Sequence, residues 1–170
     1  MQEKVKYAKS SRDWNTYIST HVPGWRLGAL LEIRDLLTMR QFYRFAGEIW
    51  NSHEVIWSHH NLLVTYQVFD DPEEEAKHMM SQAESRVFNN QLPQKLEIFR
   101  SHGPFNKDGI CWTLSREIAV RFARQFGYNT LSSSRVRKTS ISCFFSRRNE
   151  DEIIVRPSQI HKLETRTTGI

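Results

Sequence analysis

Apolar residues recur at helical spacing through the first half of the chain, over residues 14–69. The pattern predicts one helix over residues 27–37, which continues or restarts over residues 42–50. The first dozen residues are polar, and we expect them to fray.

A further helix is predicted to begin at Asp70-Asp71-Pro72, where three glutamates follow. Asp caps a helix, Pro fits its first turn, and acidic side chains suit its positive end. We expect this helix to run to about Val87 and to end before Asn89-Asn90. Residues 1–92 therefore form a mainly helical part.

After Pro93 the spacing changes to the alternation of a β-strand. Turn residues occupy positions 101–108, and the last strand is predicted at a sheet edge. The predicted strands cover residues 95–100, 110–113, 140–146, 152–156 and 160–165.

One helix interrupts these strands, with Ser115 as its cap and Gly127 as its stop. Its apolar face includes Ile118, Ala119, Phe122, Ala123 and Phe126. The segment 128–140, which carries three consecutive serines and several cations, is predicted to be a mobile basic loop.

Composition places the chain among ordinary globular α+β proteins. With 170 residues, 39% of them apolar, and few Gly, Pro or Cys, it suits a single domain over 1–170. The β-rich part is expected over 93–170. No apolar run reaches the length of a membrane span and no secretory signal is evident, so we expect a cytoplasmic protein without a membrane partner.

The charge is unevenly distributed. The formal net charge is +5, yet between Arg100 and Arg148 there are ten Lys or Arg and only two acids. This half is expected to attract anions, although net charge describes a field and not a site.

Two weak signals for other chemistry have simpler interpretations. Cys111 and Cys143 lie in apolar surroundings, which favours buried thiols over a disulfide or a nucleophile. His53-Glu54 resembles the start of an H-E-x-x-H zinc helix, but Trp57 replaces the second histidine, and His59 and His60 come too late. No metal is expected.

A pair of carboxylates opens a late strand. Glu150 and Glu152 alternate in the E-x-E pattern before an apolar triplet, so a strand would turn both to the same side. The alternative is a solvated turn whose charges protect a strand end.

Three segments together resemble the mono-ADP-ribosyltransferase family, in the family's order. They are Ile98-Phe99-Arg100, the strand and helix start around Trp112-Thr113, and Glu150-Asp151-Glu152. The likeness covers about residues 95–165 and is similar to small phage and bacterial members. Three departures occur: Ser101 stands where Gly is usual, the first Ser of a Ser-Thr-Ser strand is replaced by Trp112, and the spacing from Arg100 to Thr113 is short.

The resemblance implies a helical part packed on a small split two-sheet core that binds NAD and releases nicotinamide. It implies that Arg100 contacts the pyrophosphate, for which a guanidinium fork is suited. Thr113 would support the nicotinamide ribose or the catalytic carboxylate. Glu152 would stabilise the cationic transition state. Glu150 would orient or deprotonate the acceptor, which favours arginine.

The resemblance also suggests further residues as candidate contacts to NAD. Ser101 and His102 follow Arg100, and His102 could contact the same phosphates. Trp112 is a candidate cofactor contact that could simply pack. Phe126 and Tyr128 could stack on nicotinamide, although packing is the commoner role of such residues.

Two other function classes stay open. One is a basic module in which Arg135, Arg137, Lys138, Arg147 and Arg148 follow nucleic-acid phosphates. The other is an inactive or NAD-hydrolysing relative that inhibits a partner by binding it. The partner of the transferase is an acceptor protein, or a nucleic-acid-containing complex met by the basic loop. The phage resemblance is compatible with an anti-defence role in a host cytoplasm.

Overall fold

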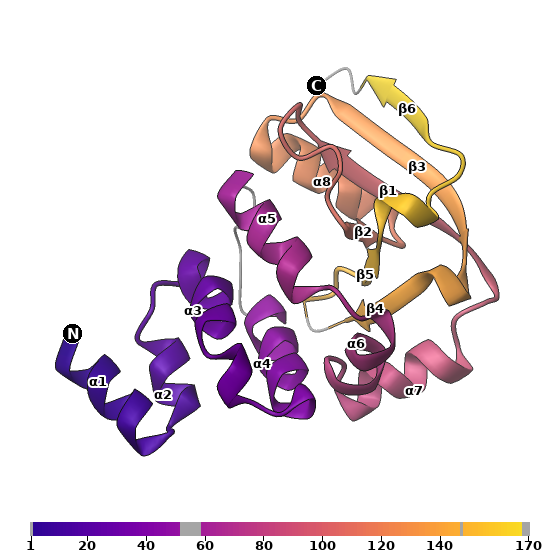
Figure 1. The fold of residues 1–170 in the computed structure, drawn as a ribbon. Helices are drawn as coiled ribbons and strands as arrows, with labels where there is room; N and C mark the ends of the chain where they lie inside the picture. The colour runs from indigo at the N-terminus through magenta and orange to yellow at the C-terminus, as the bar shows by residue number, and fades with distance from the viewer. Residues whose placement is uncertain (1, 52–58, 147, 168–170) are drawn as a thin grey trace. The chain divides into compact units, whose positions relative to one another are not determined.

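A computed structural model describes residues 2–51, 59–146 and 148–167. The chain divides into two compact units, Met1–Asp70 and Asp71–Ile170, and each is described by itself (Figure 1). The predicted change from helix to strand at residue 93 falls inside the second unit, because two helices precede its first strand. The described residues form an α+β protein, as predicted.

The first unit is helical over its described residues. Its α-helices are α1 (Gln2–Ser11), α2 (Trp14–Ser19), α3 (Arg26–Glu32), α4 (Met39–Asn51) and α5 (His59–Val68), with 3-10 turns η1 (Pro23–Trp25) and η2 (Arg34–Leu36).

Two predictions in this unit are wrong. Within the first dozen residues, which were expected to fray, Gln2–Ser11 form α1, and Ala8 of this helix is buried. The helix predicted over 27–37 stops at Glu32, because Leu37 is extended and Thr38 begins a new helix. Thr38 and Gln41 exchange hydrogen bonds, which caps α4 as a capping box does.

The second unit begins with a helix whose start is as predicted and whose end is not. The Asp71 carboxylate accepts from the backbone N–H groups of Glu73 and Glu74 and caps α6 (Pro72–His78). A second helix, α7 (Gln82–Asn90), then begins at Ser81, which forms a capping box with Glu84. The helix predicted to reach Val87 is therefore two helices.

Over residues 95–146 and 148–167 the structure describes six antiparallel strands, in the spatial order β4-β5-β2-β1-β3-β6. They are β1 (Lys95–His102), β2 (Cys111–Thr113), β3 (Thr130–Arg137), β4 (Ile141–Phe145), β5 (Glu152–Val155) and β6 (Glu164–Thr167). The short turns η3 (Lys138–Ser140) and η4 (Pro157–Gln159) flank β4 and β5.

Strand β3 corrects the prediction of a mobile basic loop. It pairs with β1 from Lys95 to His102 and lies inside the sheet. The sequence shows no strand-like alternation of apolar and polar residues here, because two of the buried positions are occupied by serines. The Ser132 hydroxyl contacts His102, and the Ser134 hydroxyl donates to the Lys162 carbonyl oxygen at 2.6 Å.

Strands β1 and β2, in the middle of the sheet, share little backbone pairing. Strands β1 and β2 are in register at one position only, Phe99 opposite Thr113. The three-stranded halves β4-β5-β2 and β1-β3-β6 meet there.

Helices cover the sheet at several strands. Helix α8 (Arg116–Phe126) lies against β1 and β3 (Figure 1), with Ser115 as its cap and Gly127 at φ 67° as its stop, as predicted. Helices α6 and α7 pack against β4. The core beneath α7 joins Phe88, Ile98, Trp112, Phe144 and Ile153.

No helix among the described residues is both long and apolar enough to cross a bilayer.

Candidate functional site

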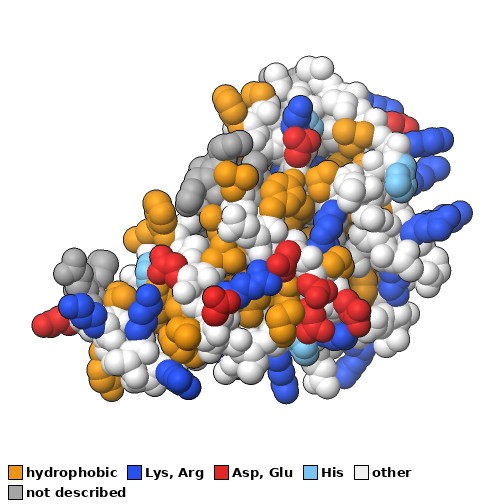
Figure 2. All heavy atoms as spheres, in the orientation of Figure 1, with side chains coloured by type: hydrophobic (Ala, Val, Ile, Leu, Met, Phe, Trp, Pro, Cys, Tyr) orange, Lys and Arg blue, Asp and Glu red, His pale blue; other side chains and the backbone are white. Residues whose placement is uncertain are grey.

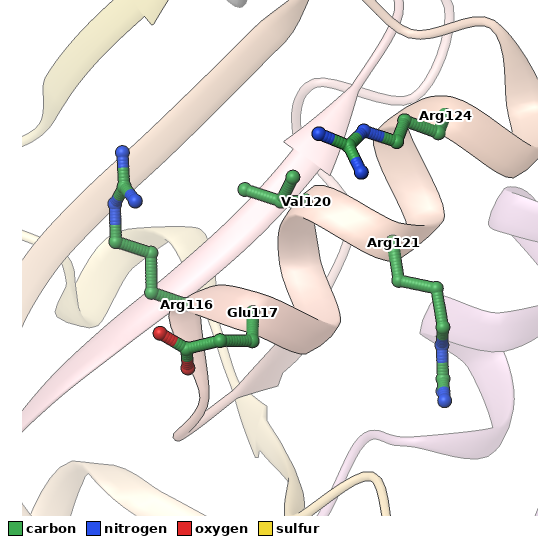
Figure 3. Close-up of a pocket in the computed structure, with 5 residues that line it drawn as sticks. All are labelled: Arg116, Glu117, Val120, Arg121 and Arg124. Atoms are coloured by element: carbon green, nitrogen blue, oxygen red, sulfur yellow. The ribbon is translucent and has the colours of Figure 1, made fainter.

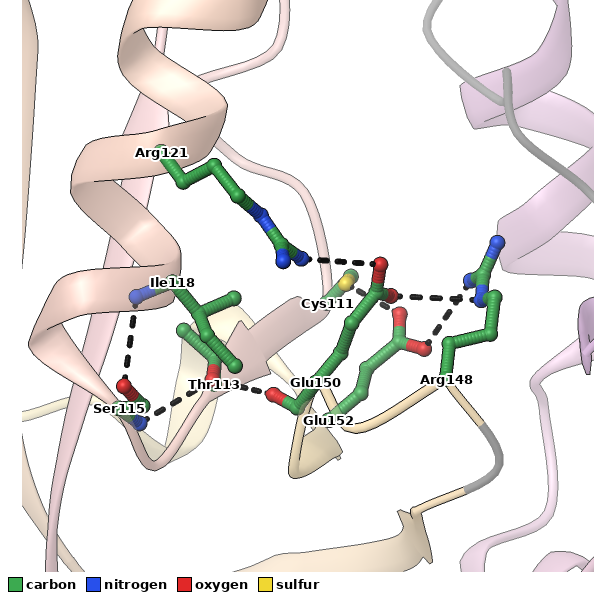
Figure 4. Close-up of polar contacts among 8 residues, drawn as sticks. All are labelled: Cys111, Thr113, Ser115, Ile118, Arg121, Arg148, Glu150 and Glu152. Carbon is green, nitrogen blue, oxygen red and sulfur yellow. Dashed lines mark hydrogen bonds and ion pairs between the residues drawn. The ribbon is translucent and has the colours of Figure 1, made fainter.

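The two carboxylates of the E-x-E motif face one guanidinium group. The Arg148 Nε lies 3.3 Å from Glu150 Oε2, and the Arg148 Nη2 lies 3.7 Å from Glu152 Oε2 (Figure 4). Glu152 is buried, at 7% exposure, and Glu150 is partly buried. Two acids and one cation therefore form a cluster at the start of β5.

The carboxylates meet for a different reason from the predicted strand alternation. Strand β5 begins at Glu152, so Glu150 lies in the turn before it. Asn149 and Asp151 take left-handed backbone conformations, with φ of 54° and 43°. Asn and Asp adopt this conformation more readily than other non-glycine residues, because their short polar side chains can form local hydrogen bonds, so these residue types suit the turn.

Strand β2 holds this turn in place. The Thr113 hydroxyl donates to the Glu150 carbonyl at 2.6 Å and accepts from the Ser115 N–H at 3.1 Å. The backbone N–H of Leu114 donates to the Asp151 carbonyl. Thr113 thus contacts the backbone of the carboxylate turn, where the resemblance had implied a contact to ribose or to the catalytic side chain.

Helix α8 adds a second cation. Ser115 caps the helix by accepting from the Ile118 N–H, which fixes the first turn. Two turns later, Arg121 Nη2 lies 3.4 Å from Glu150 Oε1. Glu150 therefore contacts Arg121 through one oxygen and Arg148 through the other (Figure 4).

Cys111 is a member of the site that the sequence reasoning missed. Its thiol donates to Glu152 Oε1 at 2.5 Å. Burial, and after it the negative charge of Glu152, raise the pKa of the Cys111 thiol well above its ordinary value, so the thiol keeps its proton. Strand alternation was the available signal, because it sets Cys111 on the same face as Thr113.

Trp112, between them, points into the core. It is buried and lies opposite Ile153, whereas Thr113 lies opposite Glu152. Directly opposed residues of antiparallel strands share a face. Cys111, and not Trp112, therefore lies on the same face as Thr113 at the site. Trp112 packs in the core on the other face of the sheet.

Arg100 approaches strand β2 from β1. Phe99 lies opposite Thr113, so strand alternation turns the Arg100 side chain to the other face of the sheet from Thr113 and Glu152. Arg100 is only 4% exposed, and its guanidinium donates to the carbonyl oxygens of Cys111 and Asn106. Gly109 allows this position, because a Cβ there would lie 2.1 Å from Arg100 Nη2. Arg100 closes the junction between β1 and β2 and is linked through Cys111 to Glu152.

His102 and Ser101 continue β1 beyond Arg100. The His102 Nε2 lies 2.9 Å from the Ser132 hydroxyl. Burial lowers the pKa of His102 below its ordinary value of 6.5, so the ring is neutral at pH 7 and lacks the charge that would favour a phosphate. Ser101 is buried, and strand alternation turns it to the face opposite Arg100.

The aromatic candidates form a partly exposed row. The rings of Phe122 and Phe126 are 6.0 Å apart between centroids, and those of Phe126 and Tyr128 are 5.8 Å apart. The Tyr128 hydroxyl accepts from the Asn106 side chain. Arg121 lies over the Phe122 ring, so the row starts beside the cation that contacts Glu150.

The zinc-like segment gives no structural observation. His53, Glu54 and Trp57 lie outside the described residues, and His59 and His60 are the first residues of α5. Among the residues that the structure describes, no three His, Cys, Asp or Glu side chains gather as a metal would require.

The cations of the predicted basic module that the structure describes have different surroundings. Arg135 and Arg137 are exposed on β3, but the Lys138 amine donates to the Asn89 carbonyl and Arg148 faces the carboxylates. Arg147 lies outside the described residues. Figure 2 shows Lys and Arg side chains gathered at the edge that carries β3 and β6.

A separate groove of about 320 Å³ runs along α8. Arg116 and Arg124 flank Val120 there, while Arg121 extends away from Val120 (Figure 3). Glu117 completes the lining.

Comparison of the chain with protein-family models, with curated proteins and with solved structures finds no significant match.

Proposed function

We propose that this protein is an NAD-dependent mono-ADP-ribosyltransferase that modifies an arginine side chain of a partner protein and releases nicotinamide. One observation carries the proposal. Arg100 and the Glu150–Glu152 pair are far apart in sequence, yet contacts to the Cys111–Thr113 strand link both of them. The resemblance implies a core split into two sheets, whereas the described strands form one six-stranded sheet in which β1 and β2 are paired at a single position.

Glu152 is suited to stabilising a cationic transition state. It is a buried carboxylate with one oxygen fixed by the Cys111 thiol, so little reorganisation is needed when positive charge develops on a ribose. The glycosidic bond of NAD breaks with its electron pair passing to nicotinamide. The logic is that of glycoside hydrolysis, in which carboxylates face an oxocarbenium-like centre.

Glu150 is suited to the acceptor. It already contacts two guanidinium groups, those of Arg121 and Arg148, which is the chemistry an arginine acceptor presents. As the acceptor nitrogen bonds to the ribose carbon, Glu150 takes up the proton that the guanidinium releases.

Arg100 has a positioning role in this proposal. One guanidinium nitrogen donates to the Cys111 carbonyl and the other to the Asn106 carbonyl. The first contact holds Cys111, whose thiol orients Glu152. Contact with the pyrophosphate of NAD requires the guanidinium to exchange these carbonyls for phosphate oxygens. Phe126 and Tyr128 offer ring faces beside the site for nicotinamide.

The test is incubation of the protein with labelled NAD and a cell lysate. We expect labelled protein and released nicotinamide, both reduced about 100-fold or more in Glu152→Gln, as when transition-state stabilisation is removed. The matched control is Glu97→Gln, the same change at an exposed position of β1, with full activity expected. Equal labelling by both variants contradicts the proposal. Nicotinamide release without a labelled acceptor indicates the NAD-hydrolysing alternative.

The α8 groove favours polyanion binding as a second candidate function. Arg116 and Arg124 flank Val120 in the groove, and their guanidinium groups suit phosphates. This function predicts that a fluorescent single-stranded RNA binds with an affinity that falls steeply with salt. Binding should be lost in a double Arg116→Glu, Arg124→Glu variant and kept in Glu152→Gln.

A further inference from the structure

Arg148 occupies the position that an acceptor arginine needs. Each carboxylate of the E-x-E motif turns one oxygen to Arg148 and the other to a different partner. Glu150 uses Oε2 for Arg148 and Oε1 for Arg121, and Glu152 uses Oε2 for Arg148 and Oε1 for Cys111. Figure 4 shows the guanidinium directed at both acids.

Arg148 differs from Arg121 in the acid that it reaches. Among the described contacts of Arg121 there is one to Glu150 and none to Glu152, whereas Arg148 contacts both. The Arg148 side chain is 32% exposed, while those of Glu150 and Glu152 are 15% and 10% exposed. The guanidinium thus lies on the more open side of the two acids, where a substrate can reach it.

We propose that the protein modifies itself at Arg148, which accepts ADP-ribose from NAD within the same chain. This inference rests on the proposed function. The bond between the ribose anomeric carbon and nicotinamide breaks, and nicotinamide leaves with the electron pair. A bond forms from Arg148 Nη2 to the anomeric carbon, and one guanidinium proton passes to Glu150 and then to water.

Proximity gives this reaction a kinetic signature. An acceptor held beside the catalytic carboxylate reacts as part of the same molecule, so its reaction has a large effective molarity. The fraction of chains modified per minute should therefore not change when the protein is diluted tenfold. Transfer between two copies would slow about tenfold in the same dilution.

The experiment uses the full chain with NAD and no other protein. Intact mass spectrometry should show one ADP-ribosyl group per chain, and peptide mapping should locate it on Arg148. Arg148→Lys keeps the positive charge but lacks the guanidinium, and it should lose the modification. The matched control is Arg135→Lys, the same change at an exposed position of β3, which should be modified like the wild type.

A parallel reaction of the wild type with agmatine, a small free guanidinium compound, separates the two proposals. Modified agmatine with an unmodified chain overturns self-modification and leaves the transferase proposal standing. Modification at another residue, or equal modification of Arg148→Lys, also overturns it. Absence of nicotinamide release with either acceptor overturns both proposals.

Discussion

The ion pair between Glu75 and Arg156 ties helix α6 to the end of β5. Glu75 has no exposed surface, and Arg156 Nη2 contacts its Oε1. Because Arg156 directly follows the strand that carries Glu152, loss of this contact should weaken the part of the fold that supports the carboxylates. The perturbation is Arg156→Met, which keeps much of the side-chain volume and removes the charge.

The expected cost follows from burial. Removing one partner of a buried pair costs about 3–5 kcal/mol, because the other charge stays buried without its counterion. Because the Arg156 side chain is 22% exposed, we expect a cost at the lower end of this range. A loss of about 3 kcal/mol lowers the ratio of folded to unfolded protein more than 100-fold. With a urea slope of about 2 kcal/mol per molar, the midpoint should fall by roughly 1.5 M.

Urea unfolding followed by tryptophan fluorescence and circular dichroism measures this shift. The control is Arg124→Met on the exposed face of α8, expected to change stability by less than about 0.5 kcal/mol. The double variant Glu75→Met, Arg156→Met should recover most of the loss, because an apolar pair in place of a buried ion pair is often neutral. A loss below about 1 kcal/mol in Arg156→Met, or an equally unstable double variant, refutes the reasoning.

Three further predictions concern the second unit. Gly109→Ala should displace the Arg100 guanidinium and cost about 1–3 kcal/mol in urea unfolding, whereas Gly28→Ala, in open space within α3, should stabilise by about 0.5–1 kcal/mol. Equal effects of the two changes would contradict the close approach. Because the pKa of folded His102 lies below 6.5, unfolding takes up a proton in acid, so stability should fall as the pH drops below about 6.5. The urea midpoint of unfolding should fall less steeply between about pH 7.5 and pH 5.5 in His102→Gln than in the wild type. The same dependence on pH in both proteins would count against a neutral His102 ring. Ser81→Ala should remove the α7 capping box and cost about 1 kcal/mol in the same assay, and no loss there would mean that the cap is dispensable.

Local signals made one element fully predictable. Helix α8 has a serine cap, an apolar stripe and a glycine stop, and each agrees with the same boundaries. Strands β1, β4 and β5 were equally readable because their apolar residues alternate or form short runs between turn residues. Such agreement among independent local rules is what makes an element readable from sequence.

The misread segments carried signals that were weaker or overlooked. Ser81 and Glu84 stand at capping-box spacing, which marks a new helix inside a run that otherwise looks continuous. Strand β3 could not be recognised from its serines, because their burial depends on partners from β1 and from the segment before β6. Propensity gives way to such tertiary contacts.

The candidate site divides in the same way. The E-x-E pair and Arg100 were found by motif, whereas Cys111 and Arg148 were not, since a thiol and an arginine have no fixed motif meaning. Their roles come from geometry: β2 alternation turns Cys111 toward Glu152, and the left-handed turn at Asn149 and Asp151 brings Arg148 back to the acids.

The strand order has a consequence for how the protein is made. Strand β2 lies between β1 and β5, and β3 lies between β1 and β6, so each half of the sheet needs a strand translated long after its neighbour. During synthesis, the early strands have an unpaired edge until their partner strands are translated. An exposed edge of this kind favours chaperone binding or aggregation. Because sheet completion depends on such distant pairings, folding of this unit should be slow.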